Sequence, residues 1–340
     1  MKRKIVSALC ICLGVFLIAG TTIYDAVKNN RETDKTDVLM GTIVTQRIYG
    51  GNVQTAEKIA DEISRLENEL ISWRVPTSAT GILNEKLSVE NEELGEYINV
   101  CNQLSQLSGG KFDITCGKLT QLWGIGTPQA KVPEQSEIDS ALQSVDYKKI
   151  TTDDGKITIG EGQSVDLGAV GKGIACDKAL FVLKQNKVKS AIINVGGSLL
   201  VHGEKSKGKC WKIGVRNPFS DDASSQIATL SLANCFVSTS GDYEKVFTDA
   251  DGKKYHHILN ALNGYPEQTD LVSVTVVTDK GILSDGLSTV CFLVGYEKSL
   301  AILEKYDAQA VFIFKDRTVK VTRGLQNNFE LTDNSFSLGA

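Results

Sequence analysis

The chain alternates between stretches in which apolar residues recur every three or four positions and shorter runs bounded by turn residues. A spacing of three and four predicts an amphipathic helix. This spacing extends from Val53 to Leu70 and from Leu94 to Leu107, and two more helices are expected at about 173–187 and 284–294.

The shorter runs predict strands. Asp-Gly pairs at 154–155 and 251–252 mark two of the turns, because hairpin turns favour these residues. The predicted strands cover residues 38–49, both sides of a hairpin within 150–159, 191–195, 211–215, 226–232, 244–249, 254–259, 272–278, 311–314 and 319–322.

These helices and strands are mixed without strict alternation, which predicts an α+β fold. No internal repeat, low-complexity block or linker divides residues 38–325. We therefore expect a single large mixed domain over 38–325, followed by a C-terminal tail at 326–340.

The first residues have a different pattern, in which Lys2, Arg3 and Lys4 precede an apolar run from Ile5 to Ile23. Such a run approaches the ~20 residues that cross a bilayer, and positive charge before it keeps the N-terminus inside. Residues 1–24 are predicted to anchor the chain in the cell membrane, with cleavage near Gly20 as the alternative. Residues 25–37 would be a polar tether to a domain outside the membrane.

Composition and charge narrow the possible partners. The net charge of −4 gives no reason to expect a nucleic-acid partner, since phosphate binding needs a basic surface. Six cysteines follow the anchor without CxxC spacing, so a zinc site is not expected, and one disulfide stays possible.

Four clusters join glycine with charged or hydroxyl residues, and the first is segment 166–173 (DLGAVGKG) at a predicted strand-to-helix junction. Exposed backbone N–H groups and a helix start favour an anion such as phosphate, and Lys172 would add positive charge. The spacing GxxxxGK[ST] is absent, so this is not a Walker loop. A tight turn with a solvated lysine is the competing interpretation.

The second and third clusters offer candidate bases. Segment 238–243 (STSGDY) is expected on a tight loop between strands, where Asp242 and the hydroxyls could orient a ligand or simply form the turn. His256 and His257 end a predicted strand, and neighbours on a strand face opposite sides. One histidine would face the site as a general base and the other would face solvent.

The fourth cluster is Asp285 with Thr289, four residues apart on a predicted helix and hence on one face. Oxygen ligands of this kind suit magnesium, which keeps waters and substrate phosphates as its other ligands. The alternative is a carboxylate that stabilises the start of the helix.

In this order, the clusters resemble the motifs of the ApbE-type FAD:protein FMN transferase family over about residues 38–325. The matching motifs are Met40-Gly41-Thr42, Phe112-Asp113-Ile114-Thr115 with Trp123-Gly124-Ile125-Gly126, segment 166–173, Gly196-Gly197, segment 240–243, His257-Ile258 with Gly264-Tyr265-Pro266, and segment 284–289. The resemblance implies a mixed domain of the ApbE/T-fold-like type.

The resemblance also implies roles for individual residues. Magnesium would be held by Asp285, Thr289 and the backbone carbonyl of Ala169, while His257 would assist the transfer. Trp73, where the family has Tyr or Phe, would stack on the flavin or adenine ring. The residues implied in FAD binding are Met40, Trp73, Asn84, Lys111, Phe112, Asp113, Asp166, Lys172 and Ile258.

The implied reaction is attack by a threonine hydroxyl on the FMN-side phosphorus of FAD, which releases AMP and leaves an FMN–threonine phosphoester. His257 or Asp242 would accept the hydroxyl proton, and the acceptor would be an exported or membrane-embedded protein. A metal-dependent FAD pyrophosphatase and a non-enzymatic flavin-binding protein at the cell surface are the alternatives. A redox flavoenzyme is a weaker one, because GxGxxG is absent.

Overall fold

A nine-stranded sheet forms the middle layer of residues 32–339, the part of the chain that the computed structural model describes. Neighbouring strands are antiparallel, except for the last pair, which is parallel. In spatial order the strands are β1 (Glu32–Leu39), β2 (Thr42–Tyr49), β6 (Ser190–Val195), β7 (Ser198–His202), β10 (Cys235–Gly241), β13 (Leu271–Thr278), β14 (Gln309–Phe314), β15 (Thr318–Val321) and β17 (Ser337–Leu338).

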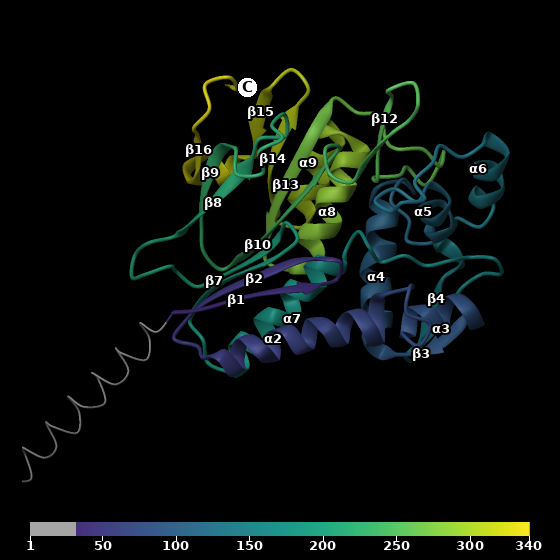
Figure 1. Cartoon of the computed structure of the whole chain (residues 1–340), viewed down its shortest axis with the longest axis horizontal. Helices are drawn as coiled ribbons and strands as arrows, with labels where there is room; N and C mark the ends of the chain where they lie inside the picture. Colours follow the sequence, from purple (N-terminus) through teal and green to yellow (C-terminus); the bar gives the residue numbers. More distant parts are fainter. Residues whose placement is uncertain (1–31, 340) are drawn as a thin grey trace, which may run out of the picture.

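One face of this sheet is covered by helices (Figure 1). Helix α8 packs on β10 and β13, and α7 packs on α8, α2 and β7. The helices are α2 (Val53–Arg65), α3 (Ala79–Lys86), α4 (Glu92–Leu107), α5 (Gly117–Trp123), α6 (Gln135–Leu142), α7 (Gly171–Gln185), α8 (Gly281–Val294) and α9 (Tyr296–Lys305).

The opposite face is covered by a three-stranded sheet of β16 (Phe329–Leu331), β9 (Gln226–Leu232) and β8 (Trp211–Arg216). Side chains alternate along a strand, so the central strands contribute to both cores. Phe236 lies in the core beneath the helices, whereas Val237 lies in the core beneath β8 and β9. Every residue of β13 is buried, because both of its faces are covered.

Helices α3, α4, α5 and α6 gather at the right-hand end of the view in Figure 1. With them lies the small sheet of β3 (Ser88–Glu90), β5 (Lys156–Thr158) and β4 (Thr151–Asp153). The hairpin of β11 (Val246–Thr248) and β12 (Lys254–His256) leads to this end. Trp123 of α5 is fully buried and donates its Nε1–H to the Gly264 carbonyl at 2.7 Å, which ties α5 to the loop after the hairpin.

The predicted α+β class is confirmed, and so are the helices α2, α4, α7 and α8 and the hairpins at 150–159 and 244–259, within a few residues at their ends. The run 38–49 is wrong as one strand. It is the hairpin β1–β2, because Met40 and Gly41 both take positive φ and reverse the chain.

The predicted tether and tail also need correction. β1 begins at Glu32, inside segment 25–37. Its charged residues suit an edge strand. One of them, Asp34, accepts a hydrogen bond of 2.9 Å from Arg47 of β2. β16 and β17 lie inside segment 326–340. The side chain of Phe336 is only 5 % exposed, and its packing in the core attaches this segment to the domain.

The predicted membrane anchor, residues 1–24, lies outside the described residues. Among residues 32–339, no helix combines the length and the apolar character that crossing a membrane requires. The six cysteines in this part of the chain are all free thiols, so the disulfide that the sequence left possible is not formed between them.

Candidate functional site

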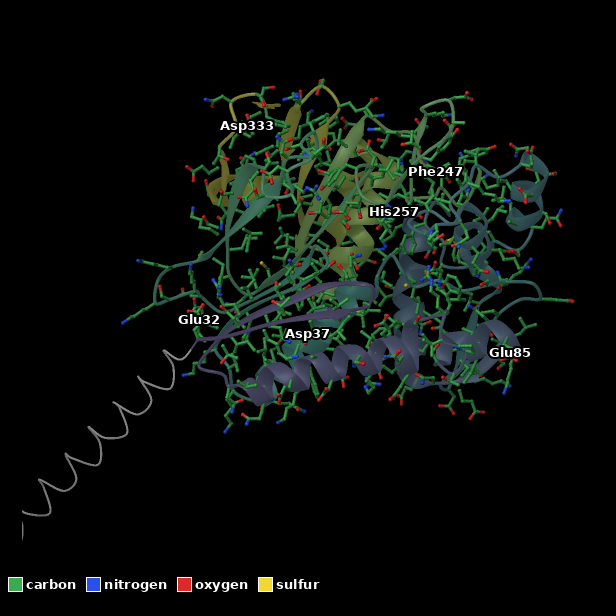
Figure 2. The ribbon with its side chains drawn as sticks, viewed as in Figure 1. Glu32, Asp37, Glu85, Phe247, His257 and Asp333 are labelled. Atoms are coloured by element: carbon green, nitrogen blue, oxygen red, sulfur yellow. The ribbon has the colours of Figure 1, made fainter. Side chains whose placement is uncertain are left out.

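Two adjoining cavities of about 210 and 280 Å³ open where the first turns of α7 and α8 meet the end of β10. We call the two together the cleft. His257 lies near the middle of the molecule, between the large sheet and the α5–α6 end (Figure 2). The residues that line both cavities are Arg74, Asp166, Gly168, Lys172, Glu244, Lys245 and His257.

The cleft depends on a close contact between α7 and α8. Gly173 has no room for a side chain, since a Cβ there would lie 2.1 Å from the Gly281 carbonyl oxygen and 2.8 Å from the Asp285 Cβ. Two helix starts can approach this closely only if the contact residues are glycines. The approach brings the Gly173 N–H to 2.9 Å from Asp285 Oδ2.

Asp285 does not cap its own helix. The first N–H groups of α8, at Gly281 and Ile282, donate to the carboxylate of Asp177 at 2.7 and 2.8 Å. Asp285 lies one turn later, only 3 % exposed, with Ser198 Oγ donating at 3.1 Å and Lys172 Nζ at 3.5 Å. The interpretation of Asp285 as a helix-start carboxylate is therefore wrong.

The three residues implied in metal binding lie together, because Asp285, Thr289 and Ala169 all line the first cavity. Residues 32–339 contain no group of three or more His, Cys, Asp or Glu side chains placed to hold a metal ion together. One carboxylate, one hydroxyl and one carbonyl are too few ligands to surround a metal ion with protein groups alone. It suits Mg²⁺, which binds through one or two carboxylates together with waters and substrate phosphates.

His257 is held as a neutral imidazole with one free nitrogen. Its Nδ1 lies 3.0 Å from the Glu244 carbonyl oxygen, which only accepts, so Nδ1 carries the proton and Nε2 keeps its lone pair. Burial, and then the positive charge of Lys245, lower the pKa of His257 to about 3. A neutral imidazole with a free Nε2 can accept a proton.

His256 faces the other way, as strand alternation predicted, but it does not face solvent. Its Nε2 is 3.0 Å from the Glu267 carbonyl oxygen, its Nδ1 accepts from the Ile258 N–H at 3.2 Å, and it is 8 % exposed. It lines a third cavity of about 670 Å³. The expected exposure of the second histidine is wrong because Phe292 packs edge-on against its ring.

Asp242 lies in the third cavity and not in the cleft, so the structure does not bring this candidate base to His257. After β10 ends, Asp242 and Tyr243 face the third cavity, whereas Glu244 and Lys245 face the cleft. The expected loop at 238–243 is also wrong, since residues 238–241 belong to β10.

Most residues implied in FAD binding line the cleft. Phe112, Asp113 and Ile258 line the first cavity, and Asp166 and Lys172 line both. Met40 and Trp73 line the second cavity. Trp73 Nε1 is buried without a hydrogen-bond partner among residues 32–339.

Asn84 and Lys111 were also predicted to bind FAD, but neither lines the cleft. Asn84 donates to the Val165 carbonyl at 2.9 Å and accepts from the Val165 N–H at 2.7 Å, which fixes the strand-like segment before Asp166. Lys111 donates to the Leu293 carbonyl at 2.8 Å and is 3.2 Å from Glu267. Asn84 therefore fixes the backbone at Val165, and Lys111 fixes the backbone at Leu293.

Sequence reasoning missed Arg74, Glu244 and Lys245, which line both cavities. Each of them follows a residue or motif that was recognised, namely Trp73 or segment 240–243. The only indication of their position was charge directly beside a candidate binding motif.

Comparison with known proteins gives one consistent answer. A model of the ApbE family matches residues 40–313. The chain is 28 % identical to the FAD:protein FMN transferase of Treponema pallidum, with 91 % of each chain covered. It is 29 % identical to that of Klebsiella pneumoniae, over 92 % of this chain and 98 % of the relative.

Solved structures agree with the sequences. The ApbE protein of Thermotoga maritima has a TM-score of 0.79 at 27 % identity and covers 88 % of this chain and 99 % of its own. The apo flavinyl transferase ApbE of Pseudomonas stutzeri has a TM-score of 0.77 at 25 % identity, covering 89 % and 98 %. The resemblance predicted from seven short motifs is confirmed. The chain belongs to the ApbE family.

Proposed function

We propose that this protein is a transferase that moves the FMN half of FAD onto a threonine hydroxyl of another protein and releases AMP. The observation that carries the proposal is the meeting of Lys172 with Asp285 at 3.5 Å, beside His257 in one cleft. The relatives named FAD:protein FMN transferase support it.

The lining of the cleft suits a dinucleotide. Phe112 and Ile258 give the first cavity an apolar wall, and Met40 and Trp73 do the same in the second. Between these walls lies Lys172, in the first turn of α7, and its positive charge favours a phosphate. FAD would place one ring system in each cavity and its diphosphate between them.

Magnesium would be held by the Asp285 carboxylate, the Thr289 hydroxyl and the Ala169 carbonyl. When bound, it supplies positive charge to the phosphate oxygens as charge develops on them. The carboxylate is already oriented, since the Gly173 N–H and the Ser198 hydroxyl each fix one of its oxygens.

His257 would act as the general base. Its Nε2 accepts the proton of the threonine hydroxyl as the threonine oxygen bonds to the FMN-side phosphorus. The bond from that phosphorus to the bridging oxygen breaks, and AMP leaves with the electron pair. Lys172 would hold the phosphate in line, which is the main requirement of phosphoryl transfer.

The acceptor would be an exported or membrane-embedded protein. This part of the proposal rests on the N-terminal sequence, where three basic residues precede an apolar run from Ile5 to Ile23. Such an anchor would place the catalytic domain outside the cell membrane with its acceptors.

The test is incubation of the purified protein with FAD, Mg²⁺ and candidate exported acceptors, followed by in-gel flavin fluorescence and chromatography of AMP. We expect fluorescence on the acceptor, its loss when the acceptor threonine becomes valine, and AMP in equal amount. Asp285→Asn should slow transfer by roughly 100-fold or more, because charge stabilisation by a metal is worth several kcal/mol. Asp139→Asn, on the exposed surface of α6, is the matched control.

The same assay separates the alternatives. A pyrophosphatase would release FMN and AMP without an acceptor, and a flavin-binding protein would release neither. Either result would refute the proposed transfer.

A further inference from the structure

Lys245 lies at the junction of the two cavities, with a defined backbone conformation and a side chain that passes Gly126. Its backbone has a φ of +44° at the end of the segment that follows β10, and its side chain lines both cavities. The aliphatic stem runs along Gly126, where an added Cβ would lie 3.4 Å from Lys245 Cδ. A side chain at Gly126 would therefore crowd the lysine.

Arg74 reaches the same junction from a segment far from Lys245 in the sequence. Its guanidinium lies 4.2 Å from the centre of the Trp73 ring, and this contact orients it. Within residues 32–339 neither Arg74 nor Lys245 forms an ion pair, although carboxylates of Asp166 and Glu244 line the same walls.

These two cations offset carboxylates that line the cleft. Asp166 and Glu244 line both cavities, Asp113 and Asp285 line the first, and Glu67 lines the second. Lys172 already lies 3.5 Å from Asp285, so Arg74 and Lys245 are the cleft cations that have no ion-pair partner among residues 32–339. A cation without a carboxylate partner is available to bind an anion.

We propose that Arg74 and Lys245 form a second phosphate-binding wall beside Lys172, which binds the diphosphate of FAD. This inference rests on the proposed function, because that function supplies the diphosphate ligand. It adds two positioning residues to the site and gives the β11–β12 hairpin, which follows Lys245, a part in substrate binding.

The position of Lys245 is consistent with this role. Burial, followed by the charge of Lys172, lowers the pKa of Lys245, and Arg74 contributes in the same direction. The three cations are therefore close enough to repel one another without a ligand. A bound phosphate would remove that repulsion.

The test measures equilibrium binding of two probes, FAD and riboflavin, by flavin fluorescence with the full chain in detergent and no acceptor present. Riboflavin has the same ring system as FMN but no phosphate. Lys245→Met keeps the stem on Gly126 and removes the charge, Lys245→Arg keeps the charge, and Arg74→Met tests the other cation. Lys253→Met is the matched control, since Lys253 is exposed in the turn of the same hairpin.

We expect Lys245→Met and Arg74→Met each to weaken FAD binding by about ten-fold or more, as loss of a charged hydrogen bond does. Riboflavin binding should change less than about two-fold with Lys245→Met, and Lys245→Arg should restore most of the FAD affinity. Lys253→Met should bind both probes like the parent protein.

Two results would overturn the proposal: unchanged FAD affinity in Lys245→Met, or an equal loss for FAD and riboflavin, which would mean that the stem and not the charge matters. If Lys245→Met does not fold, Arg74→Met decides by the same comparison. A parent protein that binds FAD with this charge dependence but transfers no FMN would refute the proposed function and leave the phosphate wall standing.

Discussion

Replacing Gly173 with alanine should destabilise the protein and displace the carboxylate of Asp285. The added Cβ would lie 2.1 Å from the Gly281 carbonyl oxygen and 2.8 Å from the Asp285 Cβ. The first of these is a backbone atom, so no side-chain rotation can relieve the clash, and α7 and α8 must separate.

The size of the effect follows from two opposing terms. Overpacking in a rigid core costs about 1–3 kcal/mol and more where backbone must move. The alanine would return at most about 1 kcal/mol through its better helix propensity. We therefore expect the free energy of unfolding to fall by about 2 kcal/mol or more, and FAD binding to weaken with it.

Gly95→Ala is the control, because it makes the same chemical change inside another helix. A Cβ at Gly95 would meet Ile157 Cγ1 at 3.8 Å, an ordinary contact. Its effect should be a gain of about 0.5–1 kcal/mol from helix propensity. Urea unfolding followed by circular dichroism compares the two variants, and a Gly173→Ala protein as stable as Gly95→Ala would refute the close helix contact.

Three further predictions concern single side chains. Because burial and Lys245 lower the pKa of His257 to about 3, its imidazole should stay neutral in the FAD-free protein from about pH 7 to about pH 5. An NMR titration of His257 in the FAD-free protein checks this, and a midpoint near the ordinary histidine pKa would contradict it. Asn84→Ala should lower the free energy of unfolding by about 1–3 kcal/mol, since it leaves the buried N–H and C=O of Val165 unpaired, and urea unfolding measures this. Trp73→Phe should bind FAD within about three-fold of the parent protein and Trp73→Ala about ten-fold more weakly, as fluorescence titration would show, because the second change removes the stacking ring.

The parts of the fold that the sequence predicted well are those in which burial follows a regular pattern. In α2, the residues that recur at helical spacing, such as Ile59 and Ile63, are fully buried against the sheet. β13 was predicted because its apolar run is long, and both of its faces are buried. The spacing of apolar residues reflects which positions are buried, so it predicts helices and strands correctly where burial is regular.

β10 shows where periodicity fails. Its second half, Ser238 to Gly241, has a loop-like composition, yet it lies in the centre of the sheet. The hydroxyls are satisfied by partners far away in sequence, such as Ser238 with Ser284 of α8 and Thr239 with Thr275 of β13, each at 2.8 Å. No local pattern could indicate these pairs.

The candidate site was predicted in part for a related reason. Gly173, Lys172 and Asp285 belong to short motifs whose order matched a family, so they could be named before their contact was known. Asp242 was misplaced because strand alternation stops at the end of β10, and only the course of the chain beyond Gly241 decides which residues enter the cleft. Asn84 was predicted to bind the ligand, and in the structure its side chain bonds the backbone of Val165.

The paired hydroxyls of β10 also explain how a polar cleft can exist against the centre of a sheet that is covered on both faces. An unpaired hydroxyl in this position would cost about 1–3 kcal/mol. Each one instead bonds to a neighbour, and Ser240 Oγ lies 2.8 Å from Ser288 Oγ and 3.1 Å from Thr289 Oγ1. The last of these pairs joins the strand to Thr289, which we propose as a magnesium ligand. The paired hydroxyls that provide hydrogen bonds for the buried strand therefore also position Thr289 in the lining of the first cavity.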